Sequence, residues 1–199
     1  CIRDRDWLDG TVLMMAWMNK VSLIKTIETN EVHYWSRSRS ELWRKGATSG
    51  NTQVLKEIRY DCDNDSIILS IEQNGSGACH TGEKSCFFNK INKNLDNSVE
   101  KDCIPPSNKC TELFDTLSER SISPKDGSYT NYLLSKGSNT ILKKIGEETA
   151  EFIMACKDND KNSISSEAAD IIYHLQVALL YKGVKWREVL SVLESRRKD

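Results

Sequence analysis

Between positions 61 and 86 the chain gathers side chains that could bind two kinds of metal ion. They are three carboxylates, three thiols and one imidazole: Asp61, Asp63, Asp65, Cys62, Cys79, Cys86 and His80. Thiolates favour zinc-like ions, whereas clustered carboxylates favour magnesium or calcium. A segment that offers both ligand types beside a histidine indicates an enzyme.

The number of thiols favours a catalytic zinc site over a structural one. A structural zinc site is usually closed by four protein ligands, whereas a catalytic site keeps one position open for water. Cys62, Cys79 and Cys86 would leave that position open, and no C-x2-C pair of the zinc-finger type occurs among them. The alternative is that some of these cysteines are small buried apolar residues.

The carboxylates lie between two segments rich in β-forming residues, Ile58–Tyr60 and Ser66–Ile71. If residues 61–65 are extended, the three aspartates share one face and Cys62 points to the other, which predicts two separate metal sites. An EF-hand loop is a rival, with Glu72 at its twelfth position. That loop needs glycine where this chain has Ser66, and it needs flanking helices.

A polar segment over 92–110 divides the chain into two halves with different patterns. We expect a β-rich α+β domain over 1–91, a linker over 92–110 and an all-α domain over 111–199. In the first half the patterns predict a strand over 11–17, a helix over 20–29 and a strand over 32–39.

The predicted strand over 32–39 would carry Arg37 and Arg39 on one face, where two guanidinium groups could grip a phosphate. Lys45 and Ser49 follow in a loop rich in glycine and hydroxyl groups, and we interpret them as further phosphate contacts. The alternative is a solvated basic edge strand.

In the second half we expect helices over 140–157 and 163–181. Each carries an acidic pair three residues apart, Glu148 with Glu151 and Glu167 with Asp170. Residues three apart are neighbours on a helix surface, so two antiparallel helices could close four carboxylates around Mg²⁺. The alternative is two acidic faces exposed to solvent.

Composition limits the class of protein. The net charge of −1 argues against a nucleic-acid-binding protein. No apolar run has the length of a membrane span, and no signal-peptide core is visible. Seven cysteines, an odd number with His80 among them, fit reduced thiols better than disulfides. We therefore expect a cytoplasmic protein without a nucleic-acid or membrane partner.

The motifs, taken in order, resemble the bifunctional histidine-biosynthesis family that fuses phosphoribosyl-AMP cyclohydrolase to phosphoribosyl-ATP pyrophosphohydrolase. In the first half the resemblance rests on DGTVLMMAWMN (9–19), HYWSRSR (33–39), LWRKGATSGN (42–51), DCDND (61–65) and ACHTGEKSCF (78–87). In the second half it rests on SYT (128–130), KKIGEETAE (143–151) and EAADIIYH (167–174).

The resemblance implies a MazG-like helical second domain and two successive hydrolytic reactions. Phosphoribosyl-ATP would lose pyrophosphate, and the adenine ring of phosphoribosyl-AMP would then open to the formimino-carboxamide ribotide. It implies a homodimer whose zinc ligands come from both subunits. The roles that it implies are zinc ligation by Cys62, Cys79 and Cys86, magnesium ligation by Asp61, Asp63 and Asp65 and by Glu148, Glu151, Glu167 and Asp170, and acid–base chemistry by His80.

Two other functions compete with this one. A non-catalytic interaction module stapled by zinc would need His80 or His33 as a fourth ligand. A zinc-dependent base deaminase would carry a P-C-x-x-C signature, which this chain lacks.

Overall fold

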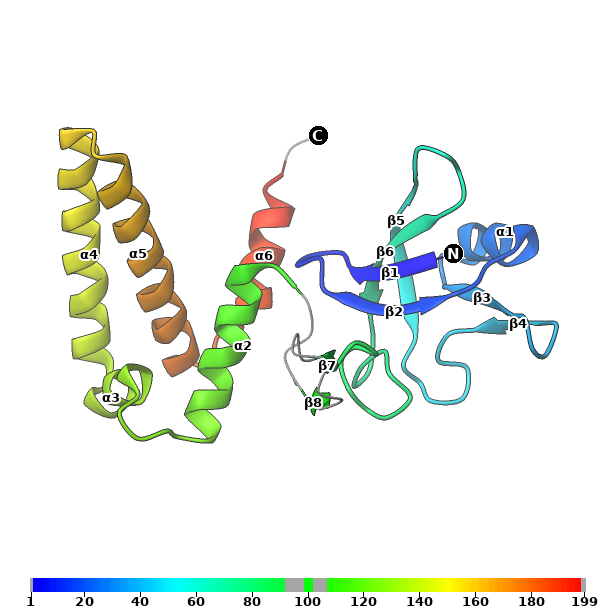
Figure 1. Ribbon diagram of the computed structural model, residues 1–199, viewed down its shortest axis with the longest axis horizontal. Coiled ribbons are helices and arrows are strands. Elements are labelled where there is room, and N and C mark those ends of the chain that lie inside the picture. Colours follow the sequence, from blue (N-terminus) through cyan, green and yellow to red (C-terminus); the bar gives the residue numbers. More distant parts are fainter. Residues whose placement is uncertain (1, 92–98, 102–106, 198–199) are drawn as a thin grey trace. The chain divides into compact units, whose positions relative to one another are not determined.

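The computed structural model describes residues 2–91, 99–101 and 107–197, which form two compact units divided between Asn108 and Lys109. The first unit is built around strands and the second from helices (Figure 1). The predicted order of an α+β domain followed by an all-α domain is confirmed. Much of the predicted linker, at 92–98 and 102–106, lies outside the described residues.

Regular structure occurs beside and within the predicted linker. Strand β7 (Asn89–Ile91) pairs antiparallel with β8 (Val99–Lys101), and α2 (Lys109–Ile122) begins inside the predicted linker. The polar composition that suggests a loop therefore conceals one strand of a short pair and the first two residues of a helix.

A four-stranded sheet organises the first unit, in the order β2-β1-β6-β5. Its strands are β1 (Ile2–Asp6), β2 (Val12–Ala16), β5 (Gln53–Tyr60) and β6 (Ile67–Gln73). β1 runs parallel to β6, whereas the other neighbours are antiparallel. A separate hairpin pairs β3 (His33–Ser36) with β4 (Glu41–Arg44).

The core of this unit forms where the apolar face of the sheet packs against β3. The residues at its centre are almost fully buried: Leu13, Val32, Tyr34, Leu69 and Ile71. Burying one such side chain stabilises the fold by about 1.5–3 kcal/mol. This packing holds the strands in place, and the candidate site residues lie near the ends of those strands.

Helix α1 (Lys20–Thr29) spans the residues predicted for it. Asn19 caps its first turn by accepting a hydrogen bond from the Ser22 amide at 2.9 Å. Its buried side chains are Ser22 and Thr26, while Val21 and Ile27 are each 59% exposed. The helix therefore packs through its hydroxyl-bearing face.

The second unit consists of α2, α3 (Tyr129–Lys136), α4 (Ser138–Asp158), α5 (Lys161–Tyr181) and α6 (Trp186–Ser195). Helices α4 and α5 lie side by side as a long antiparallel pair (Figure 1). These two helices cover the spans predicted at 140–157 and 163–181. The core of the unit consists of Leu117, Leu133, Ile141 and Val177. Each helix within the described residues is too short or too polar to span a lipid bilayer.

One carboxylate lies in the core of the strand-rich unit. Asp4 is fully buried, and its Oδ2 accepts a hydrogen bond from Gln53 Nε2 at 2.7 Å and lies 3.1 Å from the Tyr34 hydroxyl. Within the described residues its Oδ1 has no hydrogen-bond partner. Burial raises the pKa of Asp4 to about 6, although the bonds from Gln53 and Tyr34 oppose that shift.

This pKa predicts how stability depends on pH. The value is about 6 in the folded chain and near 3.8 when exposed, so the folded state binds the proton more tightly between these limits. The protonated Asp4 carboxyl therefore stabilises the folded state below about pH 4. This contribution to the free energy of unfolding, roughly 3 kcal/mol, is lost as the pH rises through 6.

Asp4→Asn should remove this loss and unfold at higher urea concentration than the parent chain at pH 8. We expect the advantage to shrink at pH 4.5, where the parent carboxyl is protonated. Urea unfolding of both proteins at the two pH values measures the difference. An equal difference at both pH values would contradict a raised pKa.

Candidate active sites

The loop that carries Cys79 and Cys86 is pinned to strand β2. The Cys86 amide donates to the Leu13 carbonyl at 2.7 Å, and the Cys79 amide donates to the Glu83 carbonyl at 3.1 Å. A Cβ atom at Gly77 would lie 2.4 Å from the Glu83 oxygen, so only glycine lets the loop close this tightly. The two thiols are thereby held close together.

The two thiols differ in acidity. Burial raises the pKa of Cys79, but hydrogen bonds outweigh burial and bring the pKa below its usual value. The first of these bonds is with Thr81 Oγ1 at 3.0 Å, the next with the Thr81 backbone, and Cys86 follows. Burial, and next the charge of Cys79, raise the pKa of Cys86 to about 11. Two adjacent sulfurs fit the donor set of a soft cation such as zinc.

Cys62 is the exception among the predicted zinc ligands. It is exposed in the turn between β5 and β6. Among the described residues, no group of three clustered ligand atoms combines it with Cys79 and Cys86. A single chain therefore brings together two of the three predicted thiols.

A cleft of about 460 Å³ lies beside the thiol loop. Among the residues that line it are Arg39, Lys45, Ser49, Cys79 and His80. The predicted acid–base residue and three of the four predicted phosphate contacts therefore share one cavity. His80 is exposed, with its Nδ1 4.0 Å from Cys79 Sγ.

Lys45 is fixed in this cleft by the backbone around it. Its ammonium group donates to the Ala78 carbonyl at 2.5 Å. The next residue, Gly46, has φ +80°, and a Cβ there would lie 2.4 Å from the Asn51 carbonyl carbon. Glycine thus allows the loop that follows Lys45 to fold closely onto itself.

The predicted strand over 32–39 is too long by four residues, one at its start and three at its end. β3 ends at Ser36, whose Oγ accepts a hydrogen bond from the Arg39 amide at 3.3 Å and so begins a turn. The Arg37 guanidinium stacks over the Trp17 ring at 3.8 Å. Arg39 pairs with Glu41 at 2.9 Å. Both arginines line a hollow of about 650 Å³, although they do not share a strand face.

The extended conformation considered for residues 61–65 does not occur. The segment is a hairpin turn in which Asp61 Oδ1 accepts from the Asp65 and Ser66 amides, both at 3.0 Å. The Ser66 amide is the main reason that the pKa of Asp61 lies below its usual value. Oxygens of Asp61, Asp63 and Asp65 nevertheless lie within 4.8 Å of one another, which fits a hard cation.

The hairpin also excludes the EF-hand alternative, because strands flank the loop on both sides. Glu72, which would complete an EF-hand, pairs with Lys56 at 2.8 Å on the neighbouring strand.

In the helical unit, α4 and α5 bring carboxylates together. Oxygens of Glu148, Glu151 and Glu167 lie within 4.8 Å of one another, and Glu148 is buried. Burial, followed by the negative charges of Glu151, Asp170 and Glu148, raises the pKa of Glu167. A divalent cation would relieve this repulsion, so the cluster fits magnesium. Asp170 acts on the cluster through its charge but is not one of its three close ligands.

Three further side chains adjoin this cluster. Lys144 Nζ lies 3.3 Å from Glu148 Oε1, and His174 Nε2 lies 3.7 Å from the same oxygen. The Tyr129 ring meets the His174 ring edge-on at 6.0 Å. Lys144 could be found from its place four residues before Glu148. No local pattern predicts that Tyr129, on α3, reaches α5.

Comparison with known proteins agrees with this division. The family model of phosphoribosyl-AMP cyclohydrolase matches residues 14–88, and that of phosphoribosyl-ATP pyrophosphohydrolase matches residues 110–197. A protein of Prochlorococcus marinus subsp. pastoris is 76% identical over 97% of this chain and 87% of its own length. A protein of Thermosynechococcus vestitus is 51% identical over 98% of this chain and 88% of its own length.

Both relatives are named histidine biosynthesis bifunctional protein HisIE. Neither an interaction module nor a deaminase is supported by these matches. The chain belongs to the HisIE family of bifunctional histidine-biosynthesis enzymes, with a cyclohydrolase domain followed by a pyrophosphohydrolase domain.

Proposed function

We propose that the helical unit converts phosphoribosyl-ATP to phosphoribosyl-AMP and pyrophosphate, and that the strand-rich unit then opens the adenine ring. The observation that carries the proposal is that each unit matches its own family model and holds its own cluster of ligands. Carboxylates gather in the helical unit, and thiols gather beside a polar cleft in the strand-rich unit.

In the helical unit Glu148, Glu151, Glu167 and Asp170 would hold magnesium. When bound, magnesium neutralises phosphate charge and fixes the geometry of the triphosphate. Glu148 and Glu151 are also the residues we assign to catalysis, because a carboxylate beside the attacking water accepts its proton. The water oxygen bonds to the α phosphorus, the bond from that phosphorus to the bridging oxygen breaks, and pyrophosphate leaves.

In the strand-rich unit Cys79 and Cys86 would hold zinc together with the partner subunit's Cys62, so we propose a homodimer. This assignment rests on the family resemblance and on the distance of Cys62 from the other two thiols. When bound, zinc acts as a Lewis acid that makes water nucleophilic near neutral pH. Asp61, Asp63 and Asp65 would hold magnesium.

The remaining roles belong to side chains that line the cleft and the hollow beside it. Arg37, Arg39, Lys45 and Ser49 would hold the substrate phosphates by charge and hydrogen bonding. His80 would carry a proton from the attacking water to the leaving nitrogen. Oxygen bonds to C6 of the adenine, the N1–C6 bond breaks, and the formimino-carboxamide ribotide forms.

We further propose that the protein works in the cytoplasm on small nucleotides. The cysteines at 62, 79, 86, 110 and 156 are free thiols, which persist in a reducing compartment.

One assay tests the proposed function. The purified chain is incubated with phosphoribosyl-ATP, Mg²⁺ and Zn²⁺, and pyrophosphate and ring-opened product are followed separately. Pyrophosphate should form first, and supplied phosphoribosyl-AMP should give the ring-opened product without pyrophosphate. Failure to form either product would refute the proposal.

Zinc content gives a further prediction. The chain should carry about one zinc ion, and Cys79→Ser should lose it because two thiols form too small a donor set. Cys156→Ser is the matched control, since Cys156 is exposed on α4 and outside both clusters. Elemental analysis of both variants measures the effect. Full zinc occupancy in Cys79→Ser would remove that residue from the ligand set.

A further inference from the structure

Three tyrosine rings lie in a row in the helical unit, and we call them the tyrosine ladder: Tyr129, Tyr132 and Tyr173. The Tyr129 centroid is 6.1 Å from that of Tyr132 and 6.2 Å from that of Tyr173, with interplanar angles of 18° and 17°. Tyr129 is 46% exposed and Tyr132 is 51% exposed. Two of the three near-parallel rings, Tyr129 and Tyr132, are therefore open to a ligand from solvent.

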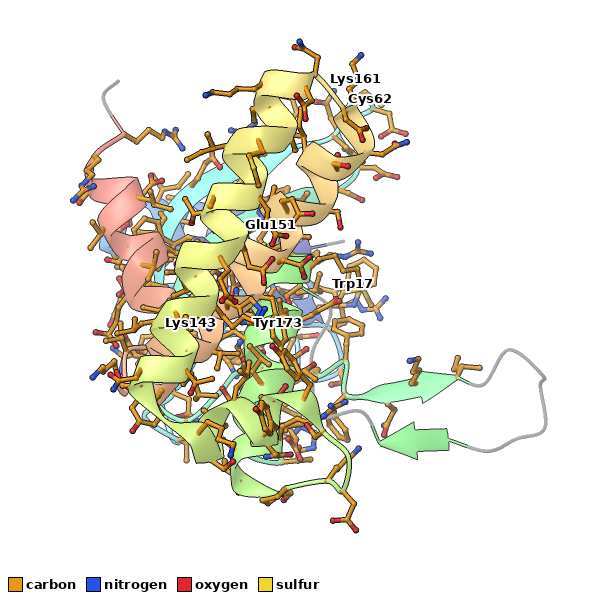
Figure 2. The ribbon with its side chains drawn as sticks, turned by 90° about the vertical axis from the view of Figure 1, so that its left-hand side faces the viewer. Trp17, Cys62, Lys143, Glu151, Lys161 and Tyr173 are labelled. Atoms are coloured by element: carbon orange, nitrogen blue, oxygen red, sulfur yellow. The ribbon has the colours of Figure 1, made fainter. Side chains whose placement is uncertain are left out.

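The ladder adjoins the acidic cluster through one side chain. His174 meets Tyr129 at 6.0 Å and Tyr173 at 5.1 Å, both edge-on, and its Nε2 lies 3.7 Å from Glu148 Oε1. Figure 2 labels Tyr173 on α5 and Glu151 on α4, which come from the ladder and from the cluster. The tyrosine ladder and the acidic cluster thus both adjoin the imidazole of His174.

The sequence motif SYT, at 128–130, builds and orients the ladder. Ser128 caps α3 by accepting a hydrogen bond from the Asn131 amide. Thr130 Oγ1 lies 2.8 Å from the Tyr173 hydroxyl and fixes that ring. Core packing is left to Leu133, which is 1% exposed. Tyr129 and Tyr132 lie outside the apolar core cluster of the helical unit.

We propose that the tyrosine ladder is the stacking platform for the purine ring of phosphoribosyl-ATP. The inference rests on the proposed pyrophosphohydrolase function and adds the residues that recognise the base. In a nucleotide the sugar lies between the base and the phosphates. In the helical unit His174 likewise lies between the tyrosine ladder and the acidic cluster. Stacking of a base on an aromatic side chain contributes a substantial share of nucleotide binding.

The test separates recognition of the base from recognition of the phosphates. Tyr129→Ala and Tyr132→Ala should raise KM for phosphoribosyl-ATP by about 5- to 100-fold in the pyrophosphate-release assay. The inhibition constant of inorganic tripolyphosphate, which has no base, should stay unchanged. Tyr129→Phe should behave as the parent chain because phenylalanine also stacks.

Tyr181→Ala is the matched control, since Tyr181 is 44% exposed in the same unit but lies outside the ladder. Its KM should not change. An unchanged KM in Tyr129→Ala and Tyr132→Ala would overturn the proposal. So would a parallel loss of tripolyphosphate inhibition, which would mean that the tyrosines only shape the acidic cluster.

Two safeguards keep the result interpretable. If Tyr129→Ala disturbs α3, as circular dichroism would reveal, Tyr132→Ala decides the question because half of that side chain is exposed. Absence of pyrophosphate release from the parent chain would instead refute the proposed function, which is a different outcome from an unchanged KM.

Discussion

Glu148→Gln is expected to slow pyrophosphate release by about a thousandfold while ring opening of supplied phosphoribosyl-AMP stays unchanged. Glu148 is buried, and its Oε1 is close to both Lys144 and His174. A neutral amide would remove one charge from the proposed magnesium site. Metal-ion stabilisation of a transition state is worth several kcal/mol, and about 1.4 kcal/mol changes a rate tenfold.

The neighbouring residue supplies the matched control. Glu147 lies on the same helix and pairs with Lys143 and Lys144, both at 3.1 Å, outside the three clustered oxygens. Glu147→Gln should keep most of the activity. The measurement is the rate of each reaction in both variants. Loss of ring opening in a folded Glu148→Gln protein would show that the two reactions do not have separate sites.

His80→Ala is expected to slow ring opening by about 10²- to 10⁴-fold, the usual contribution of a positioned proton-transfer group. Zinc content and pyrophosphate release should not change. The imidazole lines the cleft and its Nδ1 is 4.0 Å from Cys79 Sγ, so it can reach a water molecule held beside that thiol without being a metal ligand.

Zinc content separates the two possible roles of His80. His80→Gln, which keeps hydrogen bonding but not proton transfer near neutral pH, should be as slow as His80→Ala. Both should retain zinc. Loss of zinc from either variant would identify the imidazole as a metal ligand and overturn its role as a proton carrier.

The elements that sequence predicted best are those fixed by local repetition. Residues three or four apart meet on a helix whatever surrounds it, so the acidic pairs on α4 and α5 could be predicted, and three of their four carboxylates lie together. The turn at residues 61–65 could not, because the Asp61 side chain bonds the Asp65 and Ser66 amides and draws the chain out of the strand. The carboxylates still converge because a tight turn also brings alternate residues together.

Other features depend on contacts between distant segments, which the periodicity of the sequence does not predict. Helix α1 buries Thr26 because the Thr26 hydroxyl accepts a hydrogen bond from the His33 amide at 2.9 Å. This bond gives the first amide of β3 a hydrogen-bond partner. The separation of Cys62 from the other two thiols, and the reach of Tyr129 to α5, follow from how distant elements pack. Spacing in the sequence carries no information about either.

The hairpin turn between β5 and β6 has a thermodynamic consequence. Cys62 lies between Asp61 and Asp63, so the proposed zinc and magnesium sites share the same few backbone torsions. Any magnesium-induced change in the turn that favours zinc must be matched by an equal effect of zinc on magnesium, because coupling free energies are reciprocal. The two metals would then bind as linked ligands, and the apparent affinity of either one would depend on the concentration of the other.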